Sequence, residues 1–301
     1  MDLQAKLLDP TLRVRLYGTT PPRASTPPDQ VAAAAEKLSA RLAGLPLDAV
    51  VVYDIQDETG RTDMQRPFPF TGTLDPRDYA RFFKLPSIVY KALGNVDEAA
   101  WQSWLEASRG VEFLSIVGRP APGKYALALS RAIRLAAAHA AGYTIGGVVI
   151  AERHTAERSE AARLLAKGIE GCRYFISQTV YHAPPTERLL ADYLRDCRGA
   201  GVAPRRIVLT FAPVGREKTL AFLRWLGVNI TPETEREILG AARPIAQSIR
   251  ICRDNLRRIL DGKYAASIPL GVNVESVSIH RDEIDASVEL FHALGEVLQG
   301  R

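Results

Sequence analysis

The chain has 301 residues, of which 47% are hydrophobic and 24% are charged, and its formal net charge is +5. This composition excludes a disordered, collagen-like or disulfide-scaffold protein, and the scattered basic residues exclude a dedicated nucleic-acid-binding role. The sequence contains neither an apolar run long enough to span a membrane nor an N-terminal signal core. We therefore expect a cytoplasmic protein without membrane contact.

Eight short, β-branched or apolar runs predict β-strands. Several of them, such as AVVVYDI and GGVVIA, are almost continuously apolar, which is typical of strands that helices cover on both faces of the sheet. The predicted strands, in chain order, are Leu12–Tyr17, Ala49–Ile55, Ser87–Lys91, Val111–Val117, Thr144–Ala151, Tyr174–Val180, Arg206–Phe211 and Ile268–Ser276.

Longer segments with helical periodicity lie between these strands, and several begin with residues that favour a helix start, such as Thr231-Pro232-Glu233. The predicted helices are Pro28–Leu42, Glu98–Ser108, Tyr125–Ala141, Ala156–Glu170, Thr186–Ala200, Glu217–Leu226, Pro232–Ala241, Ala246–Leu260 and Asp282–Gln299. Eight strands, most of them followed by a helix, predict a (β/α)₈ TIM barrel that forms a single domain over residues 1–301. The first turn lacks the G-x-G-x-x-G spacing of a dinucleotide-binding sheet.

In such a barrel the carboxyl ends of the strands form the active site. The second strand is followed by three carboxylates, Asp54, Asp57 and Glu58, which indicate either acid–base chemistry or a solvated acidic loop. Glu275 lies within an otherwise apolar strand, so its carboxylate requires a cavity or a partner such as a neighbouring strand-end arginine. We regard these four residues as catalytic candidates.

The spacing of the cysteines and histidines predicts neither a metal site nor a catalytic nucleophile. The three cysteines, Cys172, Cys197 and Cys252, lie far apart and form no CxxC pair, which suits a reducing compartment and argues against a zinc or disulfide framework. The histidines show no metal-ligand spacing, and there is neither a P-loop nor a G-x-S-x-G turn. We therefore expect no metal.

Six short motifs occur in order at the expected strand ends and on the adjoining helices. They are Tyr17–Arg23 (YGTTPPR), Phe113–Pro120 (FLSIVGRP), Ala151–His154 (AERH) with Leu164–Lys167 downstream, Phe175–Tyr181 (FISQTVY), Ala221–Ile230 (AFLRWLGVNI) and Ser278–Glu283 (SIHRDE). Together they resemble the motifs of the methylenetetrahydrofolate reductase family, the flavin-dependent barrels of one-carbon metabolism. The resemblance covers nearly the whole chain.

The resemblance implies an oxidoreductase that passes a hydride from NAD(P)H through bound FAD to a folate-type one-carbon substrate. It also leaves room for a homo-oligomer or a partner subunit. The positions that match the family's flavin contacts are Gly118, Tyr125, Ala126, His154, Glu160, Arg163 and Lys167. The positions that match its substrate contacts are Gln178, Tyr181, Phe222 and Arg281.

Three positions depart from the family pattern. Gly18 replaces the family's catalytic glutamate, Arg119 replaces the aspartate of its R-G-D segment, and Tyr53 begins a bulkier strand end than the family's T-Y-G. Either the carboxylates after the second strand supply the missing acid, or Arg119 pairs with a more anionic substrate, which makes Arg119 a further catalytic candidate. The alternative functions are a flavin-free folate- or pterin-binding barrel, a lyase or transferase that uses the carboxylates after the second strand and Glu275, and a subunit that requires a partner.

Overall fold

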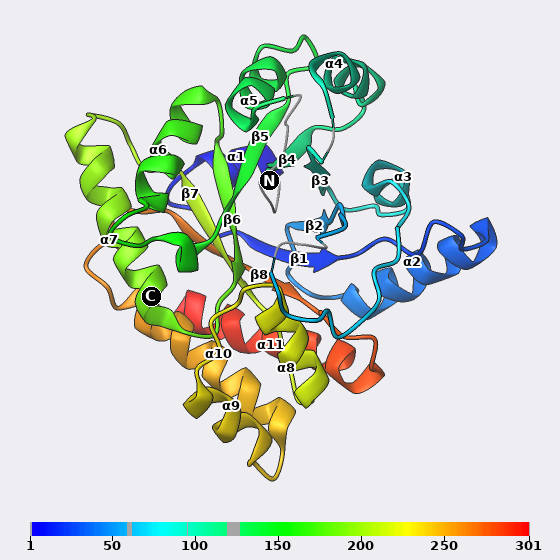
Figure 1. The fold of residues 1–301 in the computed structure, drawn as a ribbon, viewed down its shortest axis with the longest axis vertical. Coiled ribbons are helices and arrows are strands. Elements are labelled where there is room, and N and C mark those ends of the chain that lie inside the picture. The colour runs from blue at the N-terminus through cyan, green and yellow to red at the C-terminus, as the bar shows by residue number, and fades with distance from the viewer. Residues whose placement is uncertain (1, 59–61, 95, 119–126, 301) are drawn as a thin grey trace.

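Eight parallel strands close into a barrel in chain order, β1-β2-β3-β4-β5-β6-β7-β8, and helices surround it (Figure 1). The computed structural model describes residues 2–58, 62–94, 96–118 and 127–300. The strands are β1 (Arg15–Thr19), β2 (Ala49–Val52), β3 (Ser87–Ala92), β4 (Phe113–Val117), β5 (Thr144–Val149), β6 (Tyr174–Thr179), β7 (Arg206–Phe211) and β8 (Leu270–Glu275). The predicted (β/α)₈ TIM barrel is confirmed.

The helices form the outer layer, and most of them follow a strand. They are α1 (Leu3–Leu8), α2 (Pro28–Leu42), α3 (Pro76–Ala80), α4 (Glu98–Ala107), α5 (Leu129–Ala137), the 3₁₀ turn η1 (Ala151–Arg153), α6 (Glu160–Glu170), α7 (Ala183–Gly199), α8 (Glu217–Trp225), α9 (Pro232–Leu239), α10 (Pro244–Leu260) and α11 (Arg281–Gln299). None of the helices in the described parts of the chain is both long and apolar enough to cross a membrane.

The apolar side chains form two separate clusters, one inside the barrel and one outside it. The inner cluster fills the lumen with residues such as Leu16, Val51, Tyr90 and Ile176, and the outer cluster packs the helices against the strands. Both faces of every strand are therefore buried, which explains why the strands are almost continuously apolar in sequence.

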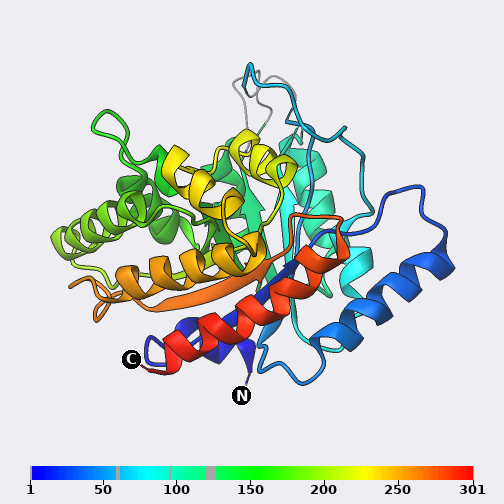
Figure 2. The same ribbon diagram turned by 90° about the horizontal axis from the view of Figure 1, so that it is seen from below.

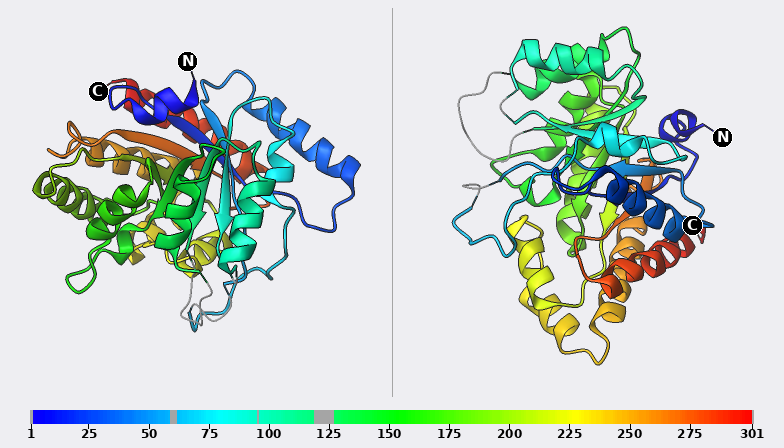
Figure 3. Two further views of the ribbon diagram at one scale, coloured as in Figure 1. Left: turned by 90° about the horizontal axis from the view of Figure 1, so that it is seen from above. Right: turned by 90° about the vertical axis from the view of Figure 1, so that its right-hand side faces the viewer.

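Helix α1 covers the amino-terminal end of the barrel. Its Leu3 and Leu7 belong to the inner cluster, so they plug the lumen from below. The buried Arg206 guanidinium, at the start of β7, donates from Nε to the Leu7 carbonyl at 3.1 Å and also to the Asp9 carbonyl. Both chain termini lie at this closed end, whereas the loop after β2 and helix α8 lie at the opposite end (Figures 2 and 3). We call that opposite, carboxyl-terminal end the mouth.

Element bounds differ from the sequence prediction at both ends of the barrel. At the closed end β1 begins at Arg15 rather than Leu12, and at the mouth it extends to Thr19 rather than Tyr17. β2 ends at Val52 rather than Ile55, and β5 ends at Val149 because the chain turns into η1. The predicted helix from Tyr125 begins at Leu129, and its first two residues lie outside the described part of the chain. The short helices α1 and α3 were not predicted. The corrections to β2 and β5 shorten these two strands at the mouth, which leaves more of the chain after them free to form loops.

Candidate functional site

Gly18 and Tyr53 fit together at the mouth, where β1 and β2 end. A Cβ atom built on Gly18 would lie 2.4 Å from the Tyr53 hydroxyl oxygen and 2.7 Å from its ring, so only a glycine leaves room for that ring. Gly18 is also the register partner of Glu275 on the neighbouring strand β8. The position at which the resembling family carries a glutamate on β1 is therefore adjacent, at the same level of the barrel, to a glutamate on β8.

Glu275 is held by two hydroxyl groups. Thr179 Oγ1, on β6, donates to Glu275 Oε1 at 2.8 Å, and the Tyr53 hydroxyl donates to the same carboxylate. Burial raises the pKa of Glu275, and these two hydrogen bonds oppose that rise without cancelling it. Burial and the nearby Glu275 carboxylate raise the pKa of Tyr53, so its phenol stays protonated. Glu275 is thus a carboxyl group that can hold a proton at a higher pH than usual.

Asn273 extends this network across the mouth. Its Nδ2 donates to the Tyr53 hydroxyl at 2.8 Å and to Thr210 Oγ1, on β7, at 3.2 Å. Its Oδ1 is buried and has no hydrogen-bond partner in the described parts of the chain. The network therefore joins β2, β6, β7 and β8, and leaves one acceptor unused.

Gln178 presents a second unused acceptor. Its Nε2 donates to the Leu226 carbonyl at 2.6 Å, which fixes the amide and ties the end of β6 to the segment after α8. Its Oε1 is buried, and no described residue donates to it. Because a buried amide oxygen without a partner costs free energy, its position favours a ligand that carries N–H donors.

Phe222 belongs to an aromatic group beside Gln178. Its ring stacks on that of Trp225, with centroids 6.0 Å apart, and meets the Phe68 ring edge-on at 5.5 Å. Arg66, on the loop after β2, lies over the Phe222 and Trp225 rings at 5.7 and 4.8 Å from their centroids. Sequence reasoning found Phe222 but missed Arg66, although the alternation R-P-F-P-F at positions 66–70 is a visible signal in the loop.

The end of β5 contributes Glu152, a second carboxyl group with a raised pKa. Its Oε1 accepts a hydrogen bond from the Asn229 backbone N–H at 3.4 Å, and burial raises the pKa of its side chain. Sequence reasoning did not select Glu152 as a candidate. Its contact with the segment after α8 places it near the Gln178 side of the mouth.

The carboxylates after β2 have structural contacts. Asp54 Oδ2 accepts a hydrogen bond from the Ala92 N–H at 2.8 Å and lies 3.5 Å from Lys91 Nζ, so it joins the ends of β2 and β3. Asp57 and Glu58 follow on the loop, and each already takes part in an interaction of its own. Of the predicted carboxylates, Glu275 is the one that the structure places in the network across the mouth.

The flavin-assigned residues contact one another. His154 Nδ1 accepts from the Glu160 N–H at 3.2 Å, and its Nε2 pairs with Asp192 Oδ2 at 2.9 Å. Lys167 Nζ donates to the Val148 carbonyl at 2.7 Å and lies 3.8 Å from Glu160 Oε1. Both nitrogens of His154 are thus occupied, and Lys167 is engaged with the protein itself.

The remaining predicted residues are dispersed. Arg163 has a half-exposed side chain 3.8 Å from Glu160 Oε2, and the Gly118 carbonyl accepts from Gln56 Nε2 at 3.4 Å. The buried Tyr181 donates to the Ala212 carbonyl at 2.5 Å within the outer apolar cluster, and Arg281 begins α11 with a side chain that is 87% exposed. Arg119, Tyr125 and Ala126 lie outside the described residues.

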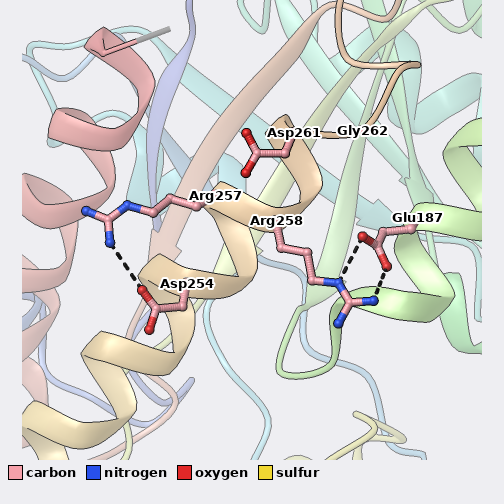
Figure 4. Close-up of a pocket in the computed structure, with 6 residues that line it drawn as sticks. All are labelled: Glu187, Asp254, Arg257, Arg258, Asp261 and Gly262. Atoms are coloured by element: carbon pink, nitrogen blue, oxygen red, sulfur yellow. Dashed lines mark hydrogen bonds and ion pairs between the residues drawn. The ribbon is translucent and has the colours of Figure 1, made fainter.

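No group of three or more His, Cys, Asp or Glu side chains within the described ranges is placed to hold a metal ion. Figure 4 shows a surface hollow between α7 and α10, lined by Glu187, Asp254, Arg257, Arg258, Asp261 and Gly262. In this hollow Arg258 pairs with Glu187 at 2.8 Å and Arg257 with Asp254 at 3.2 Å, so its arginines are neutralised.

Comparison with known proteins gives one informative similarity. No family model matches the chain, and no curated protein does. Among solved structures, an uncharacterized protein from Clostridium thermocellum, described as binding two copies of 5-methyl-5,6,7,8-tetrahydrofolic acid, matches with a TM-score of 0.83. The two chains are 28% identical, and the match covers 99% of each. The similarity therefore extends over the entire barrel and the loops of its mouth.

Proposed function

We propose that the mouth of this barrel binds a reduced folate of the 5-methyltetrahydrofolate class. The similarity over 99% of both chains to a protein described as binding that molecule carries the proposal. The side chains at the mouth support it, because Gln178 Oε1 and Asn273 Oδ1 are buried acceptors without described partners, and a pterin ring offers N–H donors. The rings of Phe222 and Trp225 provide an aromatic surface on α8, the helix that precedes the Leu226 carbonyl bound by Gln178.

Glu275 is the carboxyl group best suited to hold a proton for this ligand. It lies beside Gly18 in the strand register, receives hydrogen bonds from Tyr53 and Thr179, and has a pKa raised by burial. A protonated carboxyl group can donate to a pterin nitrogen or oxygen, whereas an ionised one can only accept. The alternative of a lyase or transferase that uses the carboxylates after β2 has less support, because Asp54 is held by Ala92 and Lys91.

A flavin-dependent reduction with NAD(P)H as the electron donor is the second candidate function. The order of the six motifs favours it. The described residues assigned to the flavin do not fit the role well, because His154 and Lys167 direct their polar atoms at Asp192, Glu160 and the Val148 carbonyl. We therefore derive no step through a flavin and treat the cofactor as a separate, testable proposal.

Tryptophan fluorescence during titration with 5-methyltetrahydrofolate tests the folate proposal, because Trp225 lies at the mouth. We expect saturable quenching in protein freed of any flavin. The Gln178→Ala variant should bind about fivefold more weakly, since a lost hydrogen bond is worth about 1 kcal/mol and about 1.4 kcal/mol corresponds to a factor of ten.

The matched control is Gln247→Ala on α10, which removes an amide that contacts Glu237 on the surface and should leave affinity unchanged. Thermal melts of both variants verify that they are folded. Absence of binding by the wild-type protein would refute the folate proposal, and equal affinity of wild type and Gln178→Ala would refute the role of Gln178.

A further inference from the structure

The loop after β2 contains a segment in which prolines alternate with an arginine and two phenylalanines, Arg66-Pro67-Phe68-Pro69-Phe70. Each proline fixes its own φ angle and restricts the preceding residue to extended conformations. The chain bends at Pro67 and Phe68, and Arg66, Phe68 and Phe70 all make contacts within one aromatic group. This segment therefore contributes one cation, Arg66, and two aromatic rings, Phe68 and Phe70, to the same aromatic group.

The part of the loop that follows this segment is hydrogen-bonded to the chain after β1. The Ala24 N–H donates to the Gly72 carbonyl at 3.0 Å, and the Leu74 N–H donates to the Pro22 carbonyl at 2.9 Å. These two hydrogen bonds flank an antiparallel bridge between Arg23 and Thr73. The segment is therefore tied to the chain that follows β1.

Three aromatic rings surround the Arg66 guanidinium. Its Cζ lies 5.3 Å from the ring centroid of Phe70, 5.7 Å from that of Phe222 and 4.8 Å from that of Trp225. We call Arg66, Phe70, Phe222 and Trp225 the Arg66 cage. Such cation–π contacts stabilise the charge, but the rings accept no conventional hydrogen bonds from the guanidinium N–H groups.

Arg66 is half-buried, and two of its three guanidinium nitrogens lack the partners that buried donors need. Its Nε and Nη1 atoms are both inaccessible to solvent and have no hydrogen-bond acceptor among the described residues. A buried charge with unused donors costs free energy unless an anion or an acceptor joins it. The Nε–H and Nη1–H bonds point in different directions, so each can donate one hydrogen bond to an anionic oxygen such as that of a carboxylate.

A second cation reinforces the positive charge of this region. Lys218, on the first turn of α8, places its Nζ 4.6 Å from the ring centroid of Phe68, the ring that also contacts Phe222. Two positive charges are thus grouped around one set of aromatic rings. Their combined field favours an anionic group on the ligand.

The Arg66 cage adjoins the amide of Gln178. Gln178 Nε2 is bonded to the carbonyl of Leu226, the residue that follows Trp225 in the chain. Helix α8 and the residue after it therefore contact Gln178 through the Leu226 carbonyl and Arg66 through the Phe222 and Trp225 rings. A folate has this order of groups: a pterin, an aromatic amide, and a tail that carries carboxylates.

We propose that the Arg66 cage binds a carboxylate of the ligand's acidic tail. The proposal rests on the proposed folate function and identifies where the end of the ligand opposite the pterin is held. Arg66 supplies the charge and two directed donors, and Phe70, Phe222 and Trp225 exclude water from them. The cage thereby distinguishes a folate from a pterin without a tail.

The test compares two ligands on three proteins. The ligands are 5-methyltetrahydrofolate and a tetrahydropterin that lacks the aminobenzoylglutamate tail, and the proteins are wild type, Arg66→Gln and Arg66→Lys. We expect Arg66→Gln to weaken folate binding by about tenfold to a hundredfold, the range for charge-assisted hydrogen bonds, and to leave the tailless pterin unaffected. The affinity of Arg66→Lys for folate should lie between those of wild type and Arg66→Gln, because lysine keeps the charge but loses the directed donors of the planar guanidinium.

The control variant is Arg81→Gln, which removes a surface arginine 3.6 Å from Asp78 and should alter neither affinity. If Arg66→Gln does not fold, as judged by its thermal melt, Arg66→Lys decides the comparison. Equal folate affinity of the Arg66 variants and wild type overturns the inference, and so does an equal loss of affinity for the tailless pterin.

The fragment p-aminobenzoylglutamate separates this inference from the folate proposal. If wild-type protein binds neither folate nor pterin, the proposed function fails, but Arg66-dependent binding of the fragment still supports the cage. Competition by inorganic phosphate stronger than that by the fragment would overturn the assignment to a carboxylate.

Discussion

At the level of single residues, Gly18, Tyr53 and Glu275 depend on one another. Gly18 leaves the space that the Tyr53 ring occupies, and the Tyr53 hydroxyl then reaches Glu275 and Asn273. A glutamate on β1, as in the resembling family, would occupy the same space as this tyrosine. The absence of that glutamate is therefore linked to the presence of the carboxyl group on β8.

The fit of Gly18 to Tyr53 can be measured by mutation. Gly18→Ala should lower the free energy of unfolding by about 1–3 kcal/mol, the usual cost of overpacking, because the added Cβ would lie 2.4 Å from the Tyr53 hydroxyl oxygen. In a Tyr53→Leu background the same change should cost much less, because the clashing atoms are removed. Urea denaturation of the four proteins of this cycle provides the measurement.

Gly110→Ala serves as the control for this cycle, since a Cβ there meets no atom within 4 Å. It should change the free energy of unfolding by less than about 0.5 kcal/mol. If Gly18→Ala were as harmless as Gly110→Ala, the Tyr53 ring would not fill the position that the structure gives it.

The raised pKa of Glu275 predicts a pH-dependent stability. The folded protein retains this proton above the ordinary pKa of 4.5, where the unfolded chain has lost it. Its contribution to stability is therefore complete below that pKa and is lost as pH rises through the higher pKa of the folded state. Glu275→Gln removes the titration while keeping the size of the side chain.

The melting temperature of Glu275→Gln relative to wild type should therefore rise between about pH 4 and about pH 8. Differential scanning fluorimetry over this range measures the difference directly. Glu36→Gln, which removes an exposed carboxylate on α2, is the control for the loss of one charge. A difference in melting temperature between Glu275→Gln and wild type that stays constant across this pH range would contradict the raised pKa of Glu275.

At the level of elements, the barrel could be predicted from the sequence. Helices bury the outer face of each strand and lumen side chains bury the inner face, so the strands are almost continuously apolar. β7 and α2 were predicted with the bounds observed, since a continuous apolar run and a clear 3.6-residue period leave little ambiguity. Helices α1 and α3, of 6 and 5 residues, are too short to show a period. The end of β5 was missed because the apolar Ile150 and Ala151 continue the apolar run of the strand into the 3₁₀ turn η1.

The candidate site was only partly predictable, because its decisive features are tertiary contacts. Glu275 was found because a charge in an apolar strand is conspicuous, and Gln178 and Phe222 came from the family resemblance. Arg66 was missed, since only the folded loop brings it to the rings of α8. Conversely, nothing in the sequence reveals that His154 is paired with Asp192, which lies 38 residues away.

At the level of the whole molecule, the two ends of the barrel have different structures. Leu3 and Leu7 close the amino-terminal end, whereas the mouth combines unused acceptors, a carboxyl group with a raised pKa and an arginine whose Nε and Nη1 find no acceptor among the described residues. A ligand that binds only the folded mouth should stabilise the protein by mass action. The resembling family would place a flavin at this same end, so the remaining question is whether folate binding requires one.

We expect the whole protein to bind folate equally well with and without added FAD. His154 and Lys167 already engage Asp192, the Glu160 N–H and the Val148 carbonyl, so a flavin would have to displace these contacts. Dialysis against FAD followed by a visible absorption spectrum measures bound flavin, and a folate titration of the same sample measures the coupling between the two ligands.

The variant His154→Ala distinguishes a structural role of His154 from a role in binding a flavin. If His154 is structural, the variant should lose about 1–2 kcal/mol of unfolding free energy, from two hydrogen bonds, and should keep its folate affinity. The opposite result, a stoichiometric flavin spectrum in wild type that disappears in a folded His154→Ala protein, would favour the flavin-dependent oxidoreductase. In that case addition of NAD(P)H should bleach the flavin, which gives the oxidoreductase a test that does not depend on any folate.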